Sequence, residues 1–378
     1  MELYVEREPF LKALGRIQTV VERRNTRPVL ANARLEANGE FLAIAATDTE
    51  VSITTRCPAE VEHSGGLTVS ARKLYEIVRE LPDKPLLLRQ DGDERLTISC
   101  DQARFHLVGL ALDQFPDIPE MEGGFRFSMS TGDLADMFAK THFAISTDEG
   151  RYTLNGVLLQ ADPPKPDSPE TVARLRMVAT DTHRLSIVEN PIPEEAGRVE
   201  NPIEAILPKK AVQEIRKLLE EGEANVELTL GERQVRFALP EMTLIANLVE
   251  GRFPNYKRVI PEGNKLLLNI PKDPLLAVVK RMSVLSNEKS RGIRMQILPD
   301  RLKVTTTNPE QEAAQEEMLT TFDGPGMSLG FNARYLLEIL TVIGGETIRF
   351  HLLDEDSSVL LTDPEKNNFL FVLMPMRI

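Results

Sequence analysis

The stretches LAIAATDTEVSI (42–53), LRMVATDTHRLSIV (175–188) and LKVTTTNPEQEA (302–313) share one pattern. Each begins with an alternating apolar segment, which predicts a strand, and continues through a Thr-Asp or Thr-Asn turn into a polar segment. The pattern returns at intervals of about 130 residues, which is the size of one ordinary domain. It therefore indicates three copies of one structural unit, with turn residues Asp48, Asp181 and Asn308.

Two amphipathic helical segments accompany each turn. One set comprises VSARKLYEIVREL (69–81), LPKKAVQEIRKLL (207–219) and FNARYLLEILTVI (331–343), and the other comprises 7–22, 131–145 and 272–286. Leu74, Ile77, Val78 and Leu81 fall on one helical face. Helices of the first set begin with cations, which the helix dipole disfavours. An external anion explains this placement, and so does a solvated helix end; basic residues at these starts are Arg72, Lys73, Lys209, Lys210 and Arg334.

Each unit thus consists of a helix, strands, a second helix and further strands. The strands are short, alternating and hairpin-like, so the fold class is α+β, with antiparallel sheets and helices on one face. Two similar linkers, FPDIPEMEGG (115–124) and GRFPNYKRVIPEGN (251–264), divide the chain. They predict domains at 1–122, 123–256 and 257–378. The proline-rich ADPPKPDSPE (161–170) predicts an exposed loop in the second domain.

The composition is that of a globular protein, with 42% hydrophobic and 27% charged residues. The charged N-terminus and the lack of a long apolar run favour a cytoplasmic protein without a membrane segment. Cys57 and Cys100 are the only cysteines, which excludes a disulfide framework or a cysteine-based zinc site. A net charge of −13 argues against DNA binding through simple phosphate neutralisation. Any role on DNA must therefore depend on a local basic surface or on topology.

Catalytic signatures are missing from the sequence. It contains no GxSxG, GxxxxGK[ST], GxGxxG or HExxH motif, and GPGMSLG (324–330) has the spacing of a hairpin loop. Asp181, His183 and Ser186 are close in sequence and leave a hydrolase as the rival interpretation. The matching turns of the other two units have no histidine, which favours a turn or a binding surface. The acidic run 354–356 favours a solvated hairpin end over a metal site.

Seven segments resemble the β subunits of bacterial DNA polymerase III, the sliding clamp family. They are YTLNGVLL (152–159), VATDTHRLSIV (178–188), VEGRFPNYKRVIP (249–261), LSNEKSRGIRM (285–295), TNPEQEAAQEE (307–317), GFNARYLLEIL (330–340) and FVLMPMRI (371–378). The resemblance implies three similar domains per chain, each with two helices and antiparallel sheets. It further implies that two chains join head to tail into a six-domain ring, a homodimer, that encircles duplex DNA and has no catalytic activity, metal or cofactor.

The resemblance also implies a pocket for short linear motifs. Its partners would be the polymerase alpha subunit, the clamp-loader delta subunit, other DNA polymerases, mismatch-repair proteins and the replication-initiation regulator. Apolar residues would form the floor of this pocket and basic ones its edge. The matching positions are Leu154, Thr180, His183, Arg184, Leu185, Pro254, Arg258, Val259, Asn332, Tyr335, Ser358, Met374, Pro375, Met376 and Arg377. The chain departs from the family pattern at Thr182, Ser290 and Asp148.

DNA contacts and the subunit interface are implied in the same way. The expected DNA-binding residues are Arg24, Arg72, Lys73, Arg151, Tyr152, Lys209 and Lys210. The expected interface residues are Arg72, Lys73, Arg104, Phe105 and Leu107 on the first domain, and Val284, Leu285, Glu310, Glu312, Glu316 and Glu317 on the third. A ring that encircles DNA stays on it without high affinity for it, so a role on DNA is compatible with the negative net charge. A monomeric DNA-binding module is the second rival, and a native mass measurement would separate it from a ring.

Overall fold

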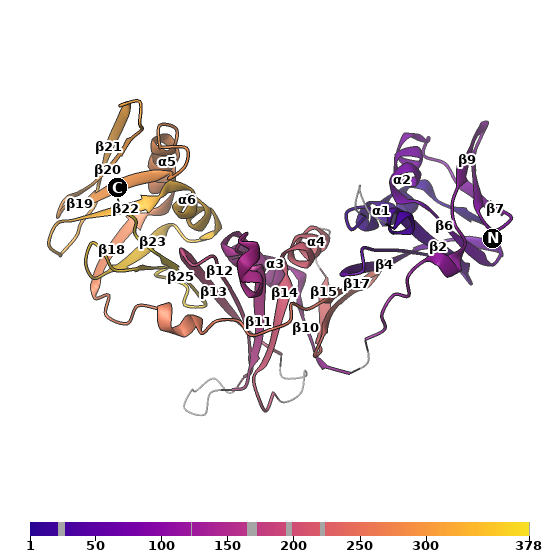
Figure 1. The fold of residues 1–378 in the computed structure, drawn as a ribbon, viewed down its shortest axis with the longest axis horizontal. Helices are drawn as coiled ribbons and strands as arrows, with labels where there is room; N and C mark the ends of the chain where they lie inside the picture. Colours follow the sequence, from indigo (N-terminus) through magenta and orange to yellow (C-terminus); the bar gives the residue numbers. More distant parts are fainter. Residues whose placement is uncertain (22–26, 122, 165–171, 194–198, 220–223, 378) are drawn as a thin grey trace. The chain divides into compact units, whose positions relative to one another are not determined.

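The computed structural model describes residues 1–21, 27–121, 123–164, 172–193, 199–219 and 224–377. The chain forms two compact units, and each unit contains one large and one small antiparallel sheet. The first unit consists mainly of residues 1–132 and 210–248, and the second mainly of residues 133–194, 198–209 and 249–378. Figure 1 traces the helices and strands along the chain.

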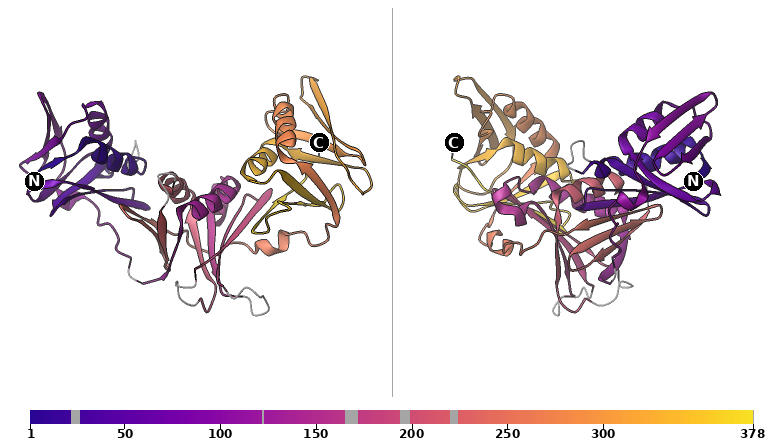
Figure 2. Two further views of the ribbon diagram at one scale, coloured as in Figure 1. Left: turned by 180° about the vertical axis from the view of Figure 1, so that it is seen from behind. Right: turned by 45° about the vertical axis from the view of Figure 1, so that its right-hand side comes forward.

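The first unit contains an eight-stranded sheet. Its strands, in order, are β10 (Phe125–Ser130), β15 (Asn225–Leu230), β16 (Gln234–Leu239), β17 (Met242–Asn247), β4 (Val51–Pro58), β3 (Phe41–Thr47), β2 (Asn32–Asn38) and β6 (Gly65–Ser70). A five-stranded sheet has the order β5 (Glu60–His63), β1 (Glu2–Val5), β7 (Leu86–Asp91), β8 (Arg95–Cys100) and β9 (Ala103–Val108). Helices α1 (Arg7–Ile17) and α2 (Ala71–Glu80) lie side by side, and α4 (Lys209–Leu219) belongs largely to this unit (Figure 2).

The second unit repeats this plan. Its eight-stranded sheet has the order β14 (Ile203–Pro208), β11 (Gly156–Asp162), β12 (Arg174–Thr180), β13 (Arg184–Pro191), β25 (Phe369–Leu373), β24 (Val359–Thr362), β23 (Thr347–Leu352) and β18 (Leu266–Pro271). A four-stranded sheet has the order β21 (Ala313–Leu319), β20 (Arg301–Thr307), β19 (Gly292–Ile297) and β22 (Met327–Asn332). Helices α5 (Lys272–Ser283) and α6 (Ala333–Val342) pack together, and α3 (Thr131–Thr141) lies mostly in this unit.

Strand order accounts for the presence of two compact units in a chain with three repeats. In the first unit, β17 of the middle repeat pairs with β4 of the first repeat. In the second unit, β13 of the middle repeat pairs with β25 of the third repeat. The strands of the middle repeat are thus divided between two continuous sheets. The sequence prediction of an antiparallel α+β fold is confirmed, because every strand pairing among the described residues is antiparallel.

The predicted turns are present, and their side chains hold them. The Oδ1 atom of Asp48 accepts hydrogen bonds from the amides of Glu50 and Val51. Asp181 does the same for the two residues that follow Thr182, and Asn308 accepts from the amide of Glu312. These are side-chain-supported turns of the kind that Asp and Asn favour. The third turn is one residue longer, since Thr307 lies opposite Ala313 whereas Thr180 lies opposite Leu185.

All six predicted helices form, and most are shorter than the amphipathic pattern. The Oγ of Ser70 accepts from the amide of Lys73 and caps α2, while Asn332 caps α6. The segment predicted as 131–145 changes after Thr141 into a 3-10 turn, His142–Ala144. The segment predicted as 7–22 ends as an α-helix at Ile17, and its last residue lies outside the described ranges.

The expected proline-rich loop at 161–170 begins with the last two residues of β11, and residues 165–170 of it lie outside the described ranges. Cys57 and Cys100 are buried free thiols, and burial raises the pKa of Cys57 to about 12. None of the described helices combines the length and the apolar character needed to cross a membrane.

Candidate functional site

The second repeated turn is the centre of the candidate site. Asp181 holds the turn through its Oδ1 atom, and its Oδ2 lies 3.1 Å from Nε of Arg184. His183 is exposed, and its ring stacks on Tyr335 at a centroid distance of 6.2 Å. The carbonyl of His183 accepts a hydrogen bond from the amide of Met374 at 3.0 Å. The turn therefore links residues that are far apart in sequence.

Arg184 is the most strongly held of the predicted residues. Its guanidinium stacks on the rings of Tyr335 and Phe143, at 4.2 and 5.0 Å from the ring centroids. It also donates to the carboxylate of Glu338 and to the carbonyl of Phe143. The side chain is nearly buried, so its charge is compensated by two carboxylates and two ring faces. Arg184 thus joins the turn to α6 and to the end of α3.

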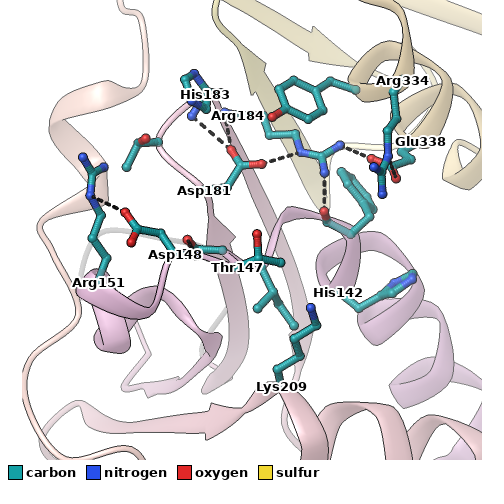
Figure 3. Close-up of a pocket in the computed structure, with 15 residues that line it drawn as sticks. His142, Thr147, Asp148, Arg151, Asp181, His183, Arg184, Lys209, Arg334 and Glu338 are labelled. Carbon is teal, nitrogen blue, oxygen red and sulfur yellow. Dashed lines mark hydrogen bonds and ion pairs between the residues drawn. The ribbon is translucent and has the colours of Figure 1, made fainter. Parts of the chain in front are cut away.

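A cavity of about 570 Å³ opens beside this arginine (Figure 3). Five predicted residues contribute to its lining: Arg151, His183, Arg184, Lys209 and Tyr335. Asp148, Asp181, Thr182 and Arg334, which the sequence singled out for other reasons, also line it. Its remaining walls come from residues that no motif singled out, namely His142, Phe143, Ile145, Ser146, Thr147 and Glu338. Cations outnumber carboxylates in this lining, and Lys209 points into the cavity. The surface suits a ligand that carries negative charge or hydrogen-bond acceptors.

An apolar cluster lies on the eight-stranded sheet of the second unit. Its buried members are Leu158, Val178, Leu185, Ile187, Ile206, Tyr256 and Val372. Of these, Leu185 is a predicted pocket residue. Predicted residue Leu154 is buried in its own right, while Val259 and Met374 remain partly exposed. The apolar residues predicted for the pocket floor therefore include buried and partly exposed side chains, all in the second unit.

A buried polar network fixes the linker over this sheet. The Tyr256 hydroxyl donates to Oε1 of Gln160 at 2.9 Å and accepts from Arg176 at 3.3 Å. Arg176 also pairs with Glu189 and Asp162, both at 2.6 Å. Burial raises the pKa of Tyr256, so its hydroxyl stays a donor at neutral pH. The network holds the short helix Tyr256–Val259, which carries the predicted residues Arg258 and Val259.

The C-terminal tail connects two sheets of the second unit. After β25, the amide of Met374 bonds to the turn at His183, and the amide of Met376 donates to the carbonyl of Gly330 in β22 at 2.8 Å. A second cavity, of about 430 Å³, lies along this tail. It is lined by Arg294, Ser328, Gly330, Glu355, Asp356, Pro375, Met376 and Arg377. Three predicted tail residues therefore share a surface with the hairpin end at 354–356.

The remaining predicted pocket residues surround these features. Pro254 and Arg258 are exposed on the linker, and Thr180 donates to the carbonyl of Arg184. The carbonyl of Ser358 accepts from Asn264, and Asn332 caps α6 with its side chain. All predicted pocket residues belong to the second unit.

Several predicted DNA-binding residues have partners inside the chain. Arg72 pairs with Glu76 at 2.7 Å, and Lys210 pairs with Asp48. Arg151 lies 3.4 Å from Asp148. These ion pairs account for three of the cations at helix starts and loops without an external anion. Of the others, Lys73 and Tyr152 are exposed, Lys209 faces the larger cavity, and Arg24 lies outside the described residues.

Five of the predicted interface residues lie on two strands at the edges of their sheets. The others lie on α2 (Arg72 and Lys73), after α5, and in the turn before β21. Phe105 and Leu107 are on β9, the outer strand of the five-stranded sheet, and Arg104 directly precedes Phe105 on the same strand. Glu316 and Glu317 are on β21, the outer strand of the four-stranded sheet. Val284 follows α5 and is 79% exposed, and Leu285 is partly buried. Glu310 and Glu312 belong to the preceding turn.

The acidic residues of β21 already have partners. Arg281 of α5 binds Glu316 with two hydrogen bonds, at 2.8 and 2.5 Å. This hydrogen-bonded partner lowers the pKa of Glu316. Arg301 binds Glu317 at 3.2 Å. The interface expected from the resemblance would set these acids against Arg72, Lys73 and Arg104 of another copy, and that pairing competes with their contacts inside the chain.

The rival hydrolase interpretation is not supported by geometry. The Ser186 hydroxyl is fully buried and donates to the carbonyl of Lys140. Asp181 is engaged with its own turn and with Arg184, and His183 stacks on Tyr335. A catalytic triad needs the histidine bonded to both the nucleophile and the acid. These three residues therefore have separate structural roles.

The acidic run also has a structural role. Asp354 accepts from the amides of Asp356 and Ser357, and Glu355 accepts from the amide of Ser328 at 2.7 Å. The hydrogen bonds from Ser357 lower the pKa of Asp354. This is the hairpin end that the sequence favoured over a metal site.

Comparison with known proteins identifies the family. Residues 1–119, 128–255 and 257–377 match the N-terminal, central and C-terminal domain models of the DNA polymerase III beta subunit. The chain is 39% identical over 380 residues to the beta sliding clamp of Caulobacter vibrioides strain NA1000 and 32% identical over 379 residues to that of Escherichia coli K12, with all of each chain covered.

Solved structures agree. A sliding clamp of Pseudomonas aeruginosa bound to griselimycin superimposes with a TM-score of 0.92 at 37% identity, and that of Caulobacter crescentus with 0.91 at 38%. Both matches cover the whole of each chain. The three matched domains and the full-length likeness show that this chain belongs to the DNA polymerase III beta subunit family, the sliding clamps.

Proposed function

We propose that two copies of this chain join head to tail into a closed ring around duplex DNA, in which the second unit of each copy binds linear motifs of its partners. As a sliding clamp, the chain is a non-catalytic processivity factor for a DNA polymerase. The domain boundaries that we propose are 1–122, 123–256 and 257–378, which agree closely with the matched ranges.

The unpaired edges of β9 and β21 carry the proposal of a homodimer. The last strand of the second repeat and the last strand of the third repeat each pair with a strand of the preceding repeat, so two such junctions lie inside the chain. At them, β17 pairs with β4 and β25 pairs with β13. The corresponding third junction would join β9 to β21, and both strands are outer strands of their sheets. Pairing between copies completes the series and removes two edges that otherwise invite aggregation.

The repeats predict the register of this third junction. Leu244 lies opposite Ile53 at the first junction, and Phe371 lies opposite Ser186 at the second. In β21 the matching position is Ala314, because it lies opposite Thr306, just as Ile53 lies opposite Ala46. Both Ala46 and Thr306 stand two residues before the turn.

In β9 the matching position is Phe105. It stands four residues before Gly109, as Leu244 stands four residues before Leu248. The amides of Gly109 and Leu248 make the same turn bond, to the carbonyls of Glu94 and Arg233. Phe105 of one copy is therefore expected opposite Ala314 of the other.

This register agrees with the apolar seam expected from the resemblance. Phe105 lies opposite the buried Ile98, so it points to the core side of its sheet. Ala314 shares a face of β21 with Glu316, which is held by α5 through Arg281. Phe105 would then meet the end of α5, where Val284 and Leu285 follow the helix. Arg104 would lie on the other face, beside Glu317 rather than Glu316.

Retention on DNA would follow from linkage rather than adhesion. Phosphate contacts hold a protein without reading sequence, and strong ones would slow sliding. A net charge of −13 limits adhesion outside the hole. The DNA-facing residues that we propose are Arg24, Arg72, Lys73, Arg151, Tyr152, Lys209 and Lys210. The ion pairs of Arg72, Arg151 and Lys210 would keep that attraction modest.

The decisive experiment compares retention on circular, linear and end-blocked DNA at raised salt, after loading by a clamp loader. We expect retention on closed circles and on end-blocked DNA, and loss from open linear DNA. A closed ring is held by its topological link with the DNA, which does not weaken with salt as phosphate contacts do. Leu285→Asp, which charges the seam, is the matched control and should yield monomers that are lost from all three substrates. Equal loss of the unmodified protein from all three would refute encirclement.

We further propose that the pocket residues predicted from the sequence bind motifs from the polymerase alpha subunit, the clamp-loader delta subunit, other DNA polymerases and mismatch-repair proteins. The tail from Met374 onward supports this, because it joins the turn at His183 to β22 and lines a cavity. Deletion of residues 374–378 should leave a folded ring that no longer binds polymerase peptides in surface plasmon resonance. Unchanged peptide affinity would place the pocket elsewhere.

A further inference from the structure

A cavity of about 520 Å³ lies on the large sheet of the first unit, and none of its lining residues is a predicted pocket residue. Its lining residues are Arg34, Glu36, Ala43, Ala45, Thr54, Asp117, Ile118, Pro119, Glu120, Met121, Arg236, Thr243 and Ile245. Strands β2, β3, β4, β16 and β17 provide its floor, and residues 117–121 of the first linker form a wall.

The repeats give this floor an exact counterpart in the second unit. One row of directly paired residues runs Arg34, Ala45, Thr54 and Thr243 in the first unit. The same row runs Leu158, Val178, Ile187 and Leu370 in the second. In a neighbouring row, Arg236 corresponds to Leu360. Large apolar side chains of the second sheet are thus replaced by alanine, threonine and arginine in the first.

The two linkers differ in the same way. In the second unit, Tyr256 of the linker packs its ring into the apolar cluster on the sheet, and Val259 follows it. In the first unit, Ile118 packs instead against a cluster of Val29, Leu30 and Phe115. The chain therefore fills this place with its own aromatic ring in one sheet and leaves it hollow in the other.

The walls define the chemistry of a ligand. Glu36 holds the Arg34 guanidinium at 2.9 Å, and Glu227 holds that of Arg236 at 3.2 Å. Guanidinium planes fixed beside a floor of small residues suit the face of an aromatic ring. The Nε atom of Arg34 is buried and has no hydrogen-bond partner in the part of the chain that the structure describes, so Glu36 alone holds this guanidinium.

Two carboxylates add a charge preference. Asp117 and Glu120 are exposed on the linker, and neither makes a hydrogen bond or ion pair with any other described residue. They would attract a cation that lies beside the ring. A free small aromatic molecule would use only the floor, whereas a peptide with basic neighbours would use both the floor and the acidic wall.

We propose that this cavity is a second partner-binding site, which takes one aromatic side chain of an extended protein segment with basic neighbours. It does not depend on ring closure or on the motif pocket of the second unit. Partners held there would occupy the first domain while other partners occupy the second unit.

The absence of tryptophan from the chain makes a direct test possible. The probe is a capped Lys-Trp-Lys tripeptide, whose indole fluorescence is the only tryptophan signal. We expect the probe to bind saturably at one site per chain, and a capped Glu-Trp-Glu probe to bind more weakly. A capped Lys-Ala-Lys tripeptide, in which alanine replaces tryptophan, should compete poorly with the probe. Ala43→Tyr, which fills the cavity, should lower the affinity on the order of tenfold or more, equivalent to the loss of one good contact. Ala59→Tyr, outside the cavity, is the matched control and should change nothing.

A second measurement locates the site and does not rely on the filled variant folding. A probe with benzoylphenylalanine in place of tryptophan should photocrosslink to Met121, because benzophenones react readily with methionine. The motif pocket has methionines of its own, Met374 and Met376. Crosslinks at Met121 that persist after deletion of residues 374–378 support the proposal. Three results would each overturn it. They are crosslinks only at Met374 or Met376, equal affinity for the Lys-Trp-Lys and Glu-Trp-Glu probes, and a lack of saturable binding.

Discussion

At the scale of one residue, Thr182 occupies a turn position whose backbone conformation favours glycine. It has a positive φ of 75°, and Thr49 at the matching turn has 80°. A β-branched residue is strained in this conformation, whereas glycine adopts it freely. The amide of Thr182 donates to the hydroxyl of Thr180, which helps to hold the turn despite the strain.

Replacement of this threonine should therefore stabilise the protein. We expect Thr182→Gly to raise the free energy of unfolding by about 1 kcal/mol, since relief of left-handed strain exceeds the entropy cost of glycine. Thermal unfolding measures the effect. The control is Thr305→Gly in the interior of β20, which should destabilise. A loss of stability in Thr182→Gly would show that the threonine side chain is needed in the turn.

At the scale of elements, the position of the short helix Tyr256–Val259 depends on hydrogen bonds to side chains of two strands. Its first residue is bonded to Gln160 of β11 and Arg176 of β12, and its last two residues are in the proposed motif pocket. The linker position is thus determined by buried polar contacts as well as by apolar packing. A polar group deprived of its partner in such a place costs on the order of 1–3 kcal/mol.

Removal of the hydroxyl should weaken peptide binding through the position of this helix. We expect Tyr256→Phe to lower the affinity for polymerase peptides roughly fivefold to tenfold, corresponding to about 1 kcal/mol. DNA retention should not change, because the network does not touch the proposed interface. Surface plasmon resonance gives the affinity, and Tyr75→Phe on α2 is the control. Equal effects of the two substitutions would argue against a positioning role for Tyr256.

At the scale of the whole molecule, the register of β9 and β21 can be tested by crosslinking. Phe105 and Ala314 should face each other as a pair without mutual backbone hydrogen bonds, like Ile53 and Leu244. Such pairs have Cα atoms about 4.5 Å apart, within disulfide range. The variant with Phe105→Cys and Ala314→Cys should form covalent dimers on mild oxidation.

The matched control combines Phe105→Cys with Met318→Cys, four residues along β21, which the proposed register places roughly 13 Å out of reach. Mass measurement under denaturing conditions detects the link. The native thiols do not interfere, because Cys57 and Cys100 are buried. Efficient crosslinking of the control in place of the first pair would mean a different register.

Much of the fold could be predicted from the sequence because it depends on local chemistry. Asp48, Asp181 and Asn308 hold their turns through amides a few residues away, and the amphipathic helices follow from spacing along the chain. The family resemblance then named the pocket residues, and the structure places all of them in the second unit. Helix ends were less predictable, because apolar spacing does not mark them: α1 ends at Ile17, and the α3 segment changes into a 3-10 turn after Thr141.

By itself, the sequence determined the threefold repeat, the α+β class, the turns and the family, since each is encoded by residues that are neighbours or recur at a fixed interval. Only the tertiary structure decided that Arg184 lies between Phe143 and Tyr335, that Tyr256 reaches Arg176, and that the first sheet has a hollow where the second is filled. These features depend on which strands become neighbours. Strand pairing brings together side chains whose separation in sequence carries no local signal, so their contacts appear only once the sheets have formed.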